Sequence, residues 1–440
     1  MQFLTLLVFI ALIYGAIGVT TNDKDFALIL RNTNLSNLIV WSYWWPLIIV
    51  TAILFGRFWC SICPIELLTS FFGKIGFRKK PNKFLKTGWV ITLFYLLIIV
   101  VGIHTLAIHR IPQFMAIYML ILFAVAVVAG LIWEKRTFCT YICPVGHLLG
   151  LYSLLSSKKL RVKNIDVCKK CTTKDCISKS NHYKFIGRSC TSELYPAKVI
   201  DNKACILCGQ CHKSCTKNNI AIQKRKFAED LFNGIKLSWS EIAFFMILSG
   251  FVVYELLSEW KVSKEIVIAV PEFINQSLNI SGSLTGTLKA ICLFIFFPLI
   301  FYLIFSALNK ILAKENWKKS FTQLVIAILP ITASMHFLKT LLKTTSRIPY
   351  WNFVLSDPKG VKTAELITDN PGLLKSDVLS FLSPYLSVIA LLLSLGGILL
   401  SLLIIRKQQY KNKASKIISI FATLIYAAIF LITIIAWRIL

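Results

Sequence analysis

The sequence predicts a mostly α-helical, polytopic membrane protein with one small cysteine-rich domain inserted between its spans. Three observations support this fold class. Of the 440 residues, 56% are hydrophobic, whereas soluble domains have about 45–50% apolar residues. Several stretches of about 20 residues carry no charge, which is the length of a transmembrane helix. Twelve of the thirteen cysteines fall into close clusters within the polar parts of the chain.

About nine apolar segments are long enough to cross a bilayer core of about 30 Å as helices. The first one has no basic n-region and no clear cleavage site, so it is expected to be a retained span rather than a signal peptide. The expected spans cover residues 2–20, 36–55, 88–107, 114–133, 237–257, 286–308, 321–343, 384–405 and 415–437.

The basic residues gather in alternate loops between these spans, which is the positive-inside pattern. It places residues 56–86 and 134–236 on the cytoplasmic side and the mixed-charge loop 344–383 outside. We therefore expect a multi-pass protein of the bacterial cytoplasmic (inner) membrane, in contact with lipid. The loops also explain the net charge of +29, so no nucleic-acid partner is expected.

The composition changes sharply between the fourth and fifth expected spans. Residues 157–230 are polar and rich in lysine and cysteine, and they contain no run long enough to span a membrane. The predicted organisation is therefore a first membrane part at 1–156, a small cytoplasmic domain at 157–230, and a second membrane part at 231–440. The middle domain is too small to bury much core, so bound metal is expected to organise it.

The cysteine spacing in the middle domain indicates iron–sulfur chemistry. Cys205 begins a C-x2-C-x2-C-x3-C run that ends at Cys215, a spacing typical of 4Fe–4S ferredoxins. In two-cluster ferredoxins the fourth cysteine of each run binds the other cluster. We therefore expect two 4Fe–4S clusters in a ferredoxin-like domain. The first would use Cys168, Cys171, Cys176 and Cys215, and the second would use Cys205, Cys208, Cys211 and Cys190.

Two alternatives apply to these eight cysteines. Disulfides are not expected, because the cysteine number is odd, the chain is long and the spacings are tight. Zinc remains an alternative, since four-cysteine zinc sites also use C-x2-C pairs. The three-cysteine core C-x2-C-x2-C fits one corner of a cubane better than the separated pairs of a zinc site.

A second pair of motifs follows the second and fourth expected spans. Each has an arginine, an aromatic residue, two cysteines and a proline, so the two hairpins resemble copies of one unit. Their cysteines are Cys60 and Cys63, followed by Pro64, and Cys139 and Cys143, followed by Pro144. Four thiols meeting at the membrane edge would hold a further cluster or another metal. Thiol redox chemistry and simple burial of small apolar residues are the alternatives.

Basic residues within the seventh expected span form a third candidate site. His336 and Lys339 share one face of a helix and lie inside an apolar segment, where charged groups are costly and usually functional. The candidate ligands are a quinone carbonyl, a haem propionate and an acidic partner, and snorkelling towards lipid headgroups is the alternative. Cys292 stands alone within the sixth span and is expected to serve packing.

Taken together, the paired cysteine–proline motifs at span ends and the two-cluster cysteine pattern resemble a known group. Residues 35–225 are similar to the membrane polyferredoxins of the NapH and NosR type, which share their core with the cytochrome oxidase assembly protein CcoG. The resemblance implies electron transfer in respiration, from quinol or a cytoplasmic donor to a periplasmic reductase. The first cysteine–proline motif is one residue shorter than the second, and the first cluster motif is irregular.

Two functions follow from these features. The first is a membrane-bound iron–sulfur electron-transfer protein that acts with respiratory partner subunits and does not complete a reaction alone. The second is an assembly factor that reduces or delivers metal to a respiratory metalloenzyme, with the paired thiols as the working site. We found no phosphate-binding glycine loop, dinucleotide fingerprint or catalytic triad pattern.

Overall fold

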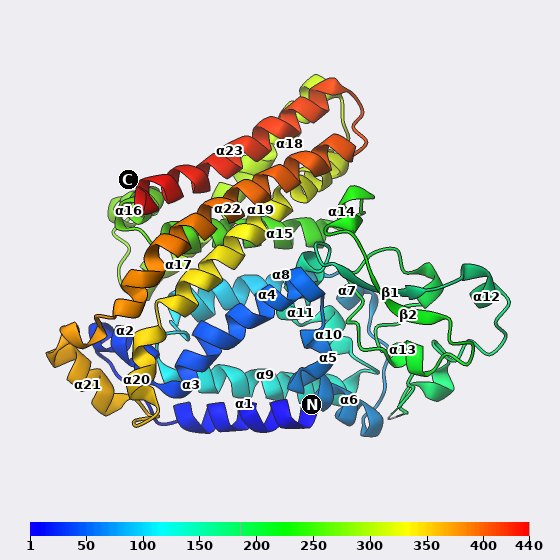
Figure 1. Cartoon of the computed structure of the whole chain (residues 1–440), viewed down its shortest axis with the longest axis horizontal. Helices are drawn as coiled ribbons and strands as arrows, with labels where there is room; N and C mark the ends of the chain where they lie inside the picture. The colour runs from blue at the N-terminus through cyan, green and yellow to red at the C-terminus, as the bar shows by residue number, and fades with distance from the viewer. Residues whose placement is uncertain (185, 440) are drawn as a thin grey trace. The chain divides into compact units, whose positions relative to one another are not determined.

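The computed structural model describes residues 1–184 and 186–439, and this part of the chain is mostly helical (Figure 1). Its sheet content is one two-stranded sheet. The fold is that of a polytopic helical protein, as predicted. Within these described residues, seven helices are long and apolar enough to cross a membrane: Leu35–Phe55, Pro112–Ile132, Trp239–Leu257, Leu284–Ala313, Trp317–Val354, Asp377–Lys407 and Lys413–Arg438.

The other two expected spans, 2–20 and 88–107, form shorter apolar helices. The first is α1 (Gln2–Ala16), with 15 residues. The second consists of α8 (Trp89–Leu97), with 9 residues, and the π-helix η2 (Ile98–Thr105), with 8 residues. At 1.5 Å per residue these helices rise about 22–26 Å, which is less than a bilayer core of about 30 Å. In the described part of the chain, seven helices rather than nine therefore meet the length requirement.

The chain divides into two compact units, and the predicted domain at 157–230 lies wholly within the first. Unit 1 consists of residues 1–14, 47–94 and 116–235, and unit 2 consists of residues 15–46, 95–115 and 236–439. Unit 1 contains the helices α5 (Trp59–Ile62), α6 (Pro64–Ile75), α7 (Lys83–Lys86), α10 (Thr137–Tyr141), α11 (Pro144–Tyr152), α12 (Ile165–Lys169), α13 (Gln210–Lys213) and α14 (Glu229–Phe232). Helices α4 (Trp45–Phe55) and α9 (Pro112–Ile132) begin in unit 2 and end in unit 1.

Each cysteine–proline motif marks the start of a helix in unit 1. Pro64 and Pro144 occupy the first turn of α6 and α11, where a missing N–H costs nothing. Cys63 and Cys143 are therefore the N-cap residues. The motif thus has a local structural cause, because proline cannot continue a helix from before but begins one well.

The small domain of unit 1 is built around its cysteines. Strands β1 (Lys158–Val162) and β2 (Ile220–Lys224) pair antiparallel, with Leu160 opposite Ile222. Helices α12 and α13 lie beside this ribbon (Figure 1), and two 3-10 turns complete the loops, η3 (Lys179–Asn181) and η4 (Pro196–Lys198). The buried core contains Leu160, Leu207, Cys211 and Ile220, with Cys176, Cys205 and Cys215 packed against it.

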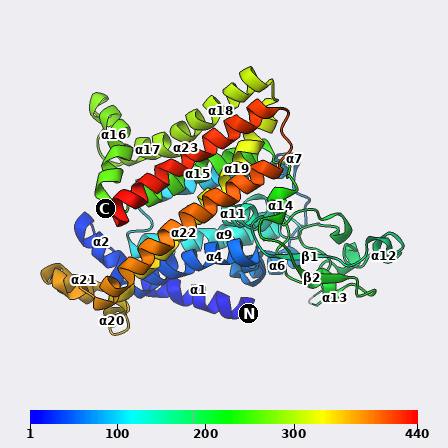
Figure 2. The same ribbon diagram turned by 45° about the horizontal axis from the view of Figure 1, so that its top comes forward.

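Unit 2 is a helix bundle with close helix contacts. Helices α15 (Trp239–Leu257), α18 (Phe297–Ala313), α19 (Trp317–Thr345), α22 (Asp377–Lys407) and α23 (Lys413–Arg438) lie side by side (Figures 1 and 2). A Cβ at Gly397 would lie 3.0 Å from the Ser334 hydroxyl, so small residues let α22 approach α19 closely. The Tyr426 hydroxyl lies 3.0 Å from that of Thr332 and donates to the Ser249 carbonyl at 3.4 Å.

The remaining elements of unit 2 are shorter. A Ser238–Glu241 capping box begins α15, which fixes the start of the first helix after the cysteine-rich domain. The π-helical turns η1 and η5 interrupt two of the long apolar helices. The shorter elements of unit 2 are α2 (Lys24–Thr33), α3 (Leu35–Leu38), η1 (Ile39–Trp44), α16 (Lys261–Ser277), α17 (Ser283–Ile291), η5 (Cys292–Phe296), η6 (Ile348–Tyr350), α20 (Trp351–Val354), α21 (Val361–Asp369) and η7 (Pro371–Leu374).

Candidate metal centres

The first predicted set of cysteines lines one cavity of the small domain. Cys168, Cys171, Cys176 and Cys215 surround a space of about 370 Å³ that opens to solvent. Burial, followed by the nearby thiols of Cys215, Cys168 and Cys171, raises the pKa of Cys176 to about 11. The structure therefore brings together the four thiols that the crossed pattern predicts, although Cys215 is far from the others in sequence.

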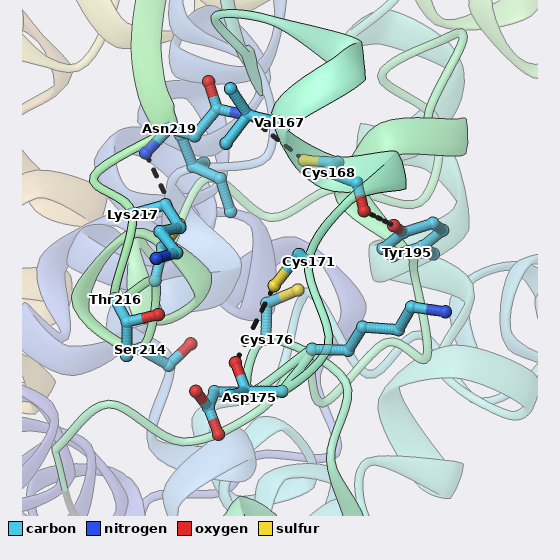
Figure 3. A pocket seen from close by; sticks show the side chains of 14 residues that line it. Val167, Cys168, Cys171, Asp175, Cys176, Tyr195, Ser214, Thr216, Lys217 and Asn219 are labelled. Atoms are coloured by element: carbon cyan, nitrogen blue, oxygen red, sulfur yellow. Dashed lines mark hydrogen bonds between the residues drawn. The ribbon is translucent and has the colours of Figure 1, made fainter.

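Asn219 and Tyr195 hold the first cavity in shape (Figure 3). The Asn219 side-chain amide donates to the Cys168 sulfur at 3.2 Å, and its backbone N–H donates to the Cys215 sulfur at 3.4 Å. The Tyr195 hydroxyl donates to the Cys168 carbonyl at 3.1 Å. Donors aimed at sulfur suit a thiolate ligand, because such hydrogen bonds stabilise its negative charge and tune the metal. The side chains present therefore fit a thiolate-ligated cluster.

The second predicted set lines another cavity, of about 310 Å³. Its thiols are those of Cys190, Cys205, Cys208 and Cys211, and the apolar wall includes Leu160 and Leu207. Burial is the main cause that raises the pKa of Cys205 to about 11, so metal binding must displace protons from these thiols. The four residues are again those of the crossed pattern.

Two residues with positive φ turn the loop around the second cavity. Leu207 has φ of 55° and Gly209 has φ of 69°. Glycine adopts this conformation at little cost, whereas a branched side chain such as leucine does so under strain. Strained backbone of this kind is common at ligand sites. The short C-x2-C-x2-C spacing thus wraps three sulfurs around one space.

The four thiols of the cysteine–proline motifs also lie near one another in unit 1. Burial raises the pKa of Cys63 well above its usual value, and the thiols of Cys139, Cys60 and Cys143 add to this effect. Burial likewise raises the pKa of Cys143 to about 12, with Cys139 as the next cause. The Gly146 N–H donates to the Cys143 sulfur at 3.4 Å. Four thiols, of which Cys60 is buried and the other three are partly buried, thus lie near a helix N-terminus, which suits anionic ligands.

A single metal ion would draw such thiols closer together than they lie here. Zinc binds four sulfurs at about 2.3 Å each. Within residues 1–184 and 186–439, no three His, Cys, Asp or Glu side chains lie close enough to share one ion. A cubane binds each sulfur through a different iron, so it accepts thiols that are further apart.

Buried charges surround the cysteine–proline thiols, and the sequence analysis assigned them no role. Glu66 is 1% exposed and pairs with Arg136 at 3.4 Å and Arg188 at 2.9 Å. Burial raises the pKa of Glu66, but Arg136 and Arg188 outweigh it and the net pKa is lowered. One sequence signal pointed to Glu66, because it is the only acid among residues 56–86. Gln2 of α1 also donates to its carboxylate.

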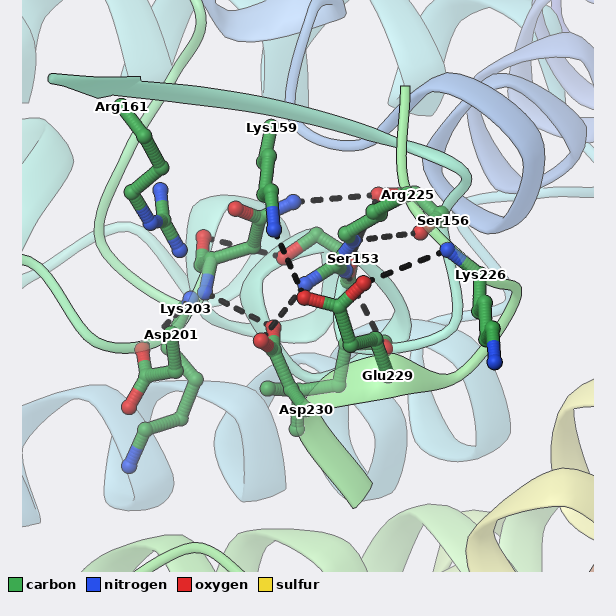
Figure 4. Close-up of polar contacts among 12 residues, drawn as sticks. Ser153, Ser156, Lys159, Arg161, Asp201, Lys203, Arg225, Lys226, Glu229 and Asp230 are labelled. Carbon is green, nitrogen blue, oxygen red and sulfur yellow. Dashed lines mark hydrogen bonds and ion pairs between the residues drawn. The ribbon is translucent and has the colours of Figure 1, made fainter. Parts of the chain in front are cut away.

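A second buried ion pair of unit 1 joins Arg225 to Asp230 (Figure 4). Arg225 pairs with Asp230 at 2.5 Å and donates to the carbonyls of Ser153 and Ser156 at 2.9 and 2.7 Å. Asp230 also accepts the Asn202 N–H at 3.0 Å, three residues before Cys205. This network connects α11, the second cysteine loop and α14. Its partners are backbone carbonyls, the Asp230 carboxylate and the Ser156 hydroxyl, so the network positions the loop rather than a ligand.

The candidate residues of the seventh expected span are buried in unit 2. Lys339 is 8% exposed and pairs with Glu255 at 3.4 Å and with Glu259, while its ammonium also donates to the Glu255 carbonyl at 2.8 Å. His336 is 4% exposed, and its ring lies 6.3 Å from that of Phe251. The acids that neutralise Lys339 come from the end of α15, and the sequence analysis did not pair them. Cys292 is buried at 5% exposure, as expected for packing.

Comparison with known proteins points to iron–sulfur binding. The family model of a 4Fe-4S binding domain matches residues 37–83 and residues 115–163. This match supports an iron–sulfur electron-transfer role. The two matched segments each contain one cysteine–proline motif, and they end before Cys168, the first cysteine of the small domain. The similarity therefore concerns the hairpins with Cys60, Cys63, Cys139 and Cys143.

Two uncharacterized proteins of Methanocaldococcus jannaschii are also similar to this chain. One is 27% identical over 180 residues, which is 39% of this chain and 67% of the relative. The other is 25% identical over 193 residues, which is 40% of this chain and 75% of the relative. No solved structure matches. These relatives are distant and have no stated activity, so the functional proposal depends on the geometry of the site.

Proposed function

We propose that this chain is a membrane-bound electron-transfer protein with two 4Fe–4S clusters in residues 157–230 and a further centre at the cysteine–proline thiols. The observation that carries the proposal is the division of eight cysteines between two cavities, four in each. Bound clusters would supply one-electron chemistry with little rearrangement of their ligands. The chain contributes the thiolates, the donors to sulfur and the apolar walls that limit access of water.

The proposed route runs between quinol or a cytoplasmic donor and a respiratory reductase on the other side of the bacterial inner membrane. The basic loops favour a cytoplasmic position for the small domain. In unit 2, His336 and the ion-paired Lys339 are the candidate quinone site, because buried polar groups inside apolar helices are costly and usually functional. The chain resembles the NapH and NosR type in its paired motifs, and that resemblance supports a partner subunit as the electron acceptor.

Electron transfer is tested directly with the anaerobically purified full-length protein. Mixing the oxidised protein with a reduced quinol analogue or with a reduced ferredoxin should bleach the cluster absorbance within one turnover. The signal should reoxidise when a soluble one-electron acceptor is added. A protein with intact clusters that neither donor reduces would contradict the proposed route, whatever its iron content.

An assembly role is the second candidate, and the four neighbouring cysteine–proline thiols favour it. Burial raises the pKa values of Cys63 and Cys143, which argues against thiol exchange at these two residues, since reactive thiols have lowered pKa values. A deletion strain separates the two functions. Electron transfer predicts lost respiratory flux with a fully metallated terminal enzyme, whereas assembly predicts a terminal enzyme that lacks its metal.

A further inference from the structure

Three charged residues of unit 1 join the cysteine–proline motifs to the second cavity. Glu66 follows Cys63 by three residues, Arg136 precedes Cys139 by three, and Arg188 precedes Cys190 by two. The Glu66 carboxylate lies 3.4 Å from Arg136 and 2.9 Å from Arg188. Each partner therefore comes from a different cysteine-bearing loop. One buried ionic cluster holds these three loops together.

Arg136 contacts residues close in sequence to cysteines of both candidate centres, namely Glu66 and Ser192. It is 2% exposed. Among the charges that act on its guanidinium are the thiols of Cys139 and Cys60 from the cysteine–proline motifs and Cys208 from the second cavity. Its Nη1 also donates to the Ser192 hydroxyl at 3.4 Å, two residues after Cys190. A single buried cation thus lies within electrostatic reach of two predicted iron–sulfur ligand sets.

Arg57, the equivalent residue of the other motif, makes a parallel connection. Its Nη1 donates to the Lys203 carbonyl at 2.6 Å, two residues before Cys205, and its Nη2 lies 4.0 Å from the Cys60 sulfur. It is 8% exposed. Both copies of the internal repeat have an arginine three residues before their first cysteine. In each copy this arginine contacts a residue two positions from a cysteine of the second cavity, Cys205 for Arg57 and Cys190 for Arg136.

The first cavity lies further along the same series. The Cys190 N–H donates to the Cys176 carbonyl at 2.9 Å. Burial, and then neighbouring thiols that include Cys176 of the first cavity, raise the pKa of Cys211 in the second cavity. The contacts thus give an order in which the cysteine–proline thiols meet the second cavity, and the second cavity meets the first.

We propose that Arg136 couples the cysteine–proline centre to the second cluster by raising the reduction potential of both. This inference rests on the proposed function. One electron passes between the two centres, so one is oxidised and the other reduced by the same amount, and no bond forms or breaks. The second cluster is then the relay between the membrane-edge centre and the first cluster.

The physical reason is charge. Each cluster becomes more negative on reduction, and a nearby cation stabilises that state more than the oxidised one. Burial weakens screening by water and salt, so the Arg136 charge stabilises the reduced state of both the cysteine–proline centre and the second cluster. Glu66 acts with the opposite sign on the same centres. The pair therefore offers two substitutions with opposite predicted effects.

The test is a redox titration of the full-length, anaerobically purified protein, followed by EPR. In Arg136→Gln, the ratio of reduced to oxidised form at a fixed potential should fall about tenfold for the second cluster and for the cysteine–proline centre, equivalent to about 59 mV for a one-electron couple. The first cluster should change less than about twofold. Arg136→Lys should recover most of the loss, and Glu66→Gln should raise the ratio.

Lys135→Gln is the matched control, because it removes a neighbouring cation whose partners are Glu134 and the more exposed Glu193. Equal shifts in all three centres, equal shifts in Lys135→Gln, or no shift in Glu66→Gln would overturn the coupling. If Arg136→Gln loses its clusters, Arg136→Lys and Glu66→Gln still decide the sign. A wild-type protein with two reducible clusters and no third centre would refute this inference and the proposed third centre, but electron transfer through the two clusters would stand. Wild-type protein without any reducible iron would refute the proposed function.

Discussion

Paired substitutions at Cys215 test which thiols share a cluster. Cys215 belongs in sequence to the run that begins at Cys205, but the structure places it in the cavity of Cys168, Cys171 and Cys176. Alanine removes the ligand without supplying another donor. Cys168→Ala with Cys215→Ala therefore removes two ligands from one site, whereas Cys205→Ala with Cys215→Ala removes one ligand from each of two sites.

The iron content gives the size of the effect. Each 4Fe–4S cluster contains four irons, so loss of one cluster removes about four irons per chain and loss of two removes about eight. The Cys168 and Cys215 double variant should lose about four. The Cys205 and Cys215 double variant should lose about eight. A run that bound one cluster with its own four cysteines would give the reverse result.

Iron and acid-labile sulfide per chain are measured on protein purified without oxygen, with EPR of the reduced samples. Cys292→Ala is the matched control, because Cys292 is buried in η5 and has a packing role. Its iron content should equal that of the wild type. If the Cys168 and Cys215 pair loses twice as much iron as the Cys205 and Cys215 pair, the crossed assignment of ligands is wrong.

Three further predictions concern stability. Arg225→Met leaves Asp230 buried without its partner, so the free energy of unfolding should fall by about 3–5 kcal/mol. Denaturant titration followed by cluster absorbance measures this change. An unchanged unfolding midpoint would contradict the stabilising role of the Arg225–Asp230 pair. Lys159 lowers the pKa of Glu229. The stabilisation from this ion pair is therefore complete above pH about 4.3 and is lost as the pH falls through the lower pKa that Glu229 has in the folded protein. The difference in Tm between wild type and Glu229→Gln should shrink between pH 7 and pH 3. Gly360 has φ of 76° and a Cβ there would lie 2.3 Å from Thr33, so Gly360→Ala should cost more than about 1 kcal/mol, whereas Gly372→Ala, with open space, should not.

The sequence was sufficient for the features that depend on local pattern. Apolar length predicted the helices, and seven of them reach a membrane-spanning length. The lengths of α1 and the α8–η2 helix were overestimated, because hydropathy does not show where the backbone turns. At the cysteine–proline motifs, proline predicts the helix start, and the structure places Cys63 and Cys143 at the N-caps.

Contacts between segments that are distant in the chain could not be predicted from the sequence. Nothing in one chain indicates that Glu66 pairs with Arg188, or Lys339 with Glu255, because both pairs are set by tertiary packing across many residues. The cavity membership of Cys215 was predictable only because ferredoxin runs exchange their fourth ligand. The roles of Arg57 and Arg136 follow from what their loops contact in the folded unit.

The most direct test of the central claim is the content and state of iron in the wild-type protein. Purified without oxygen, the full-length chain should contain at least about eight irons and eight sulfides and should give EPR signals of reduced 4Fe–4S clusters that interact magnetically. Stoichiometric zinc without sulfide, or cysteines paired as disulfides in the native protein, would contradict the account.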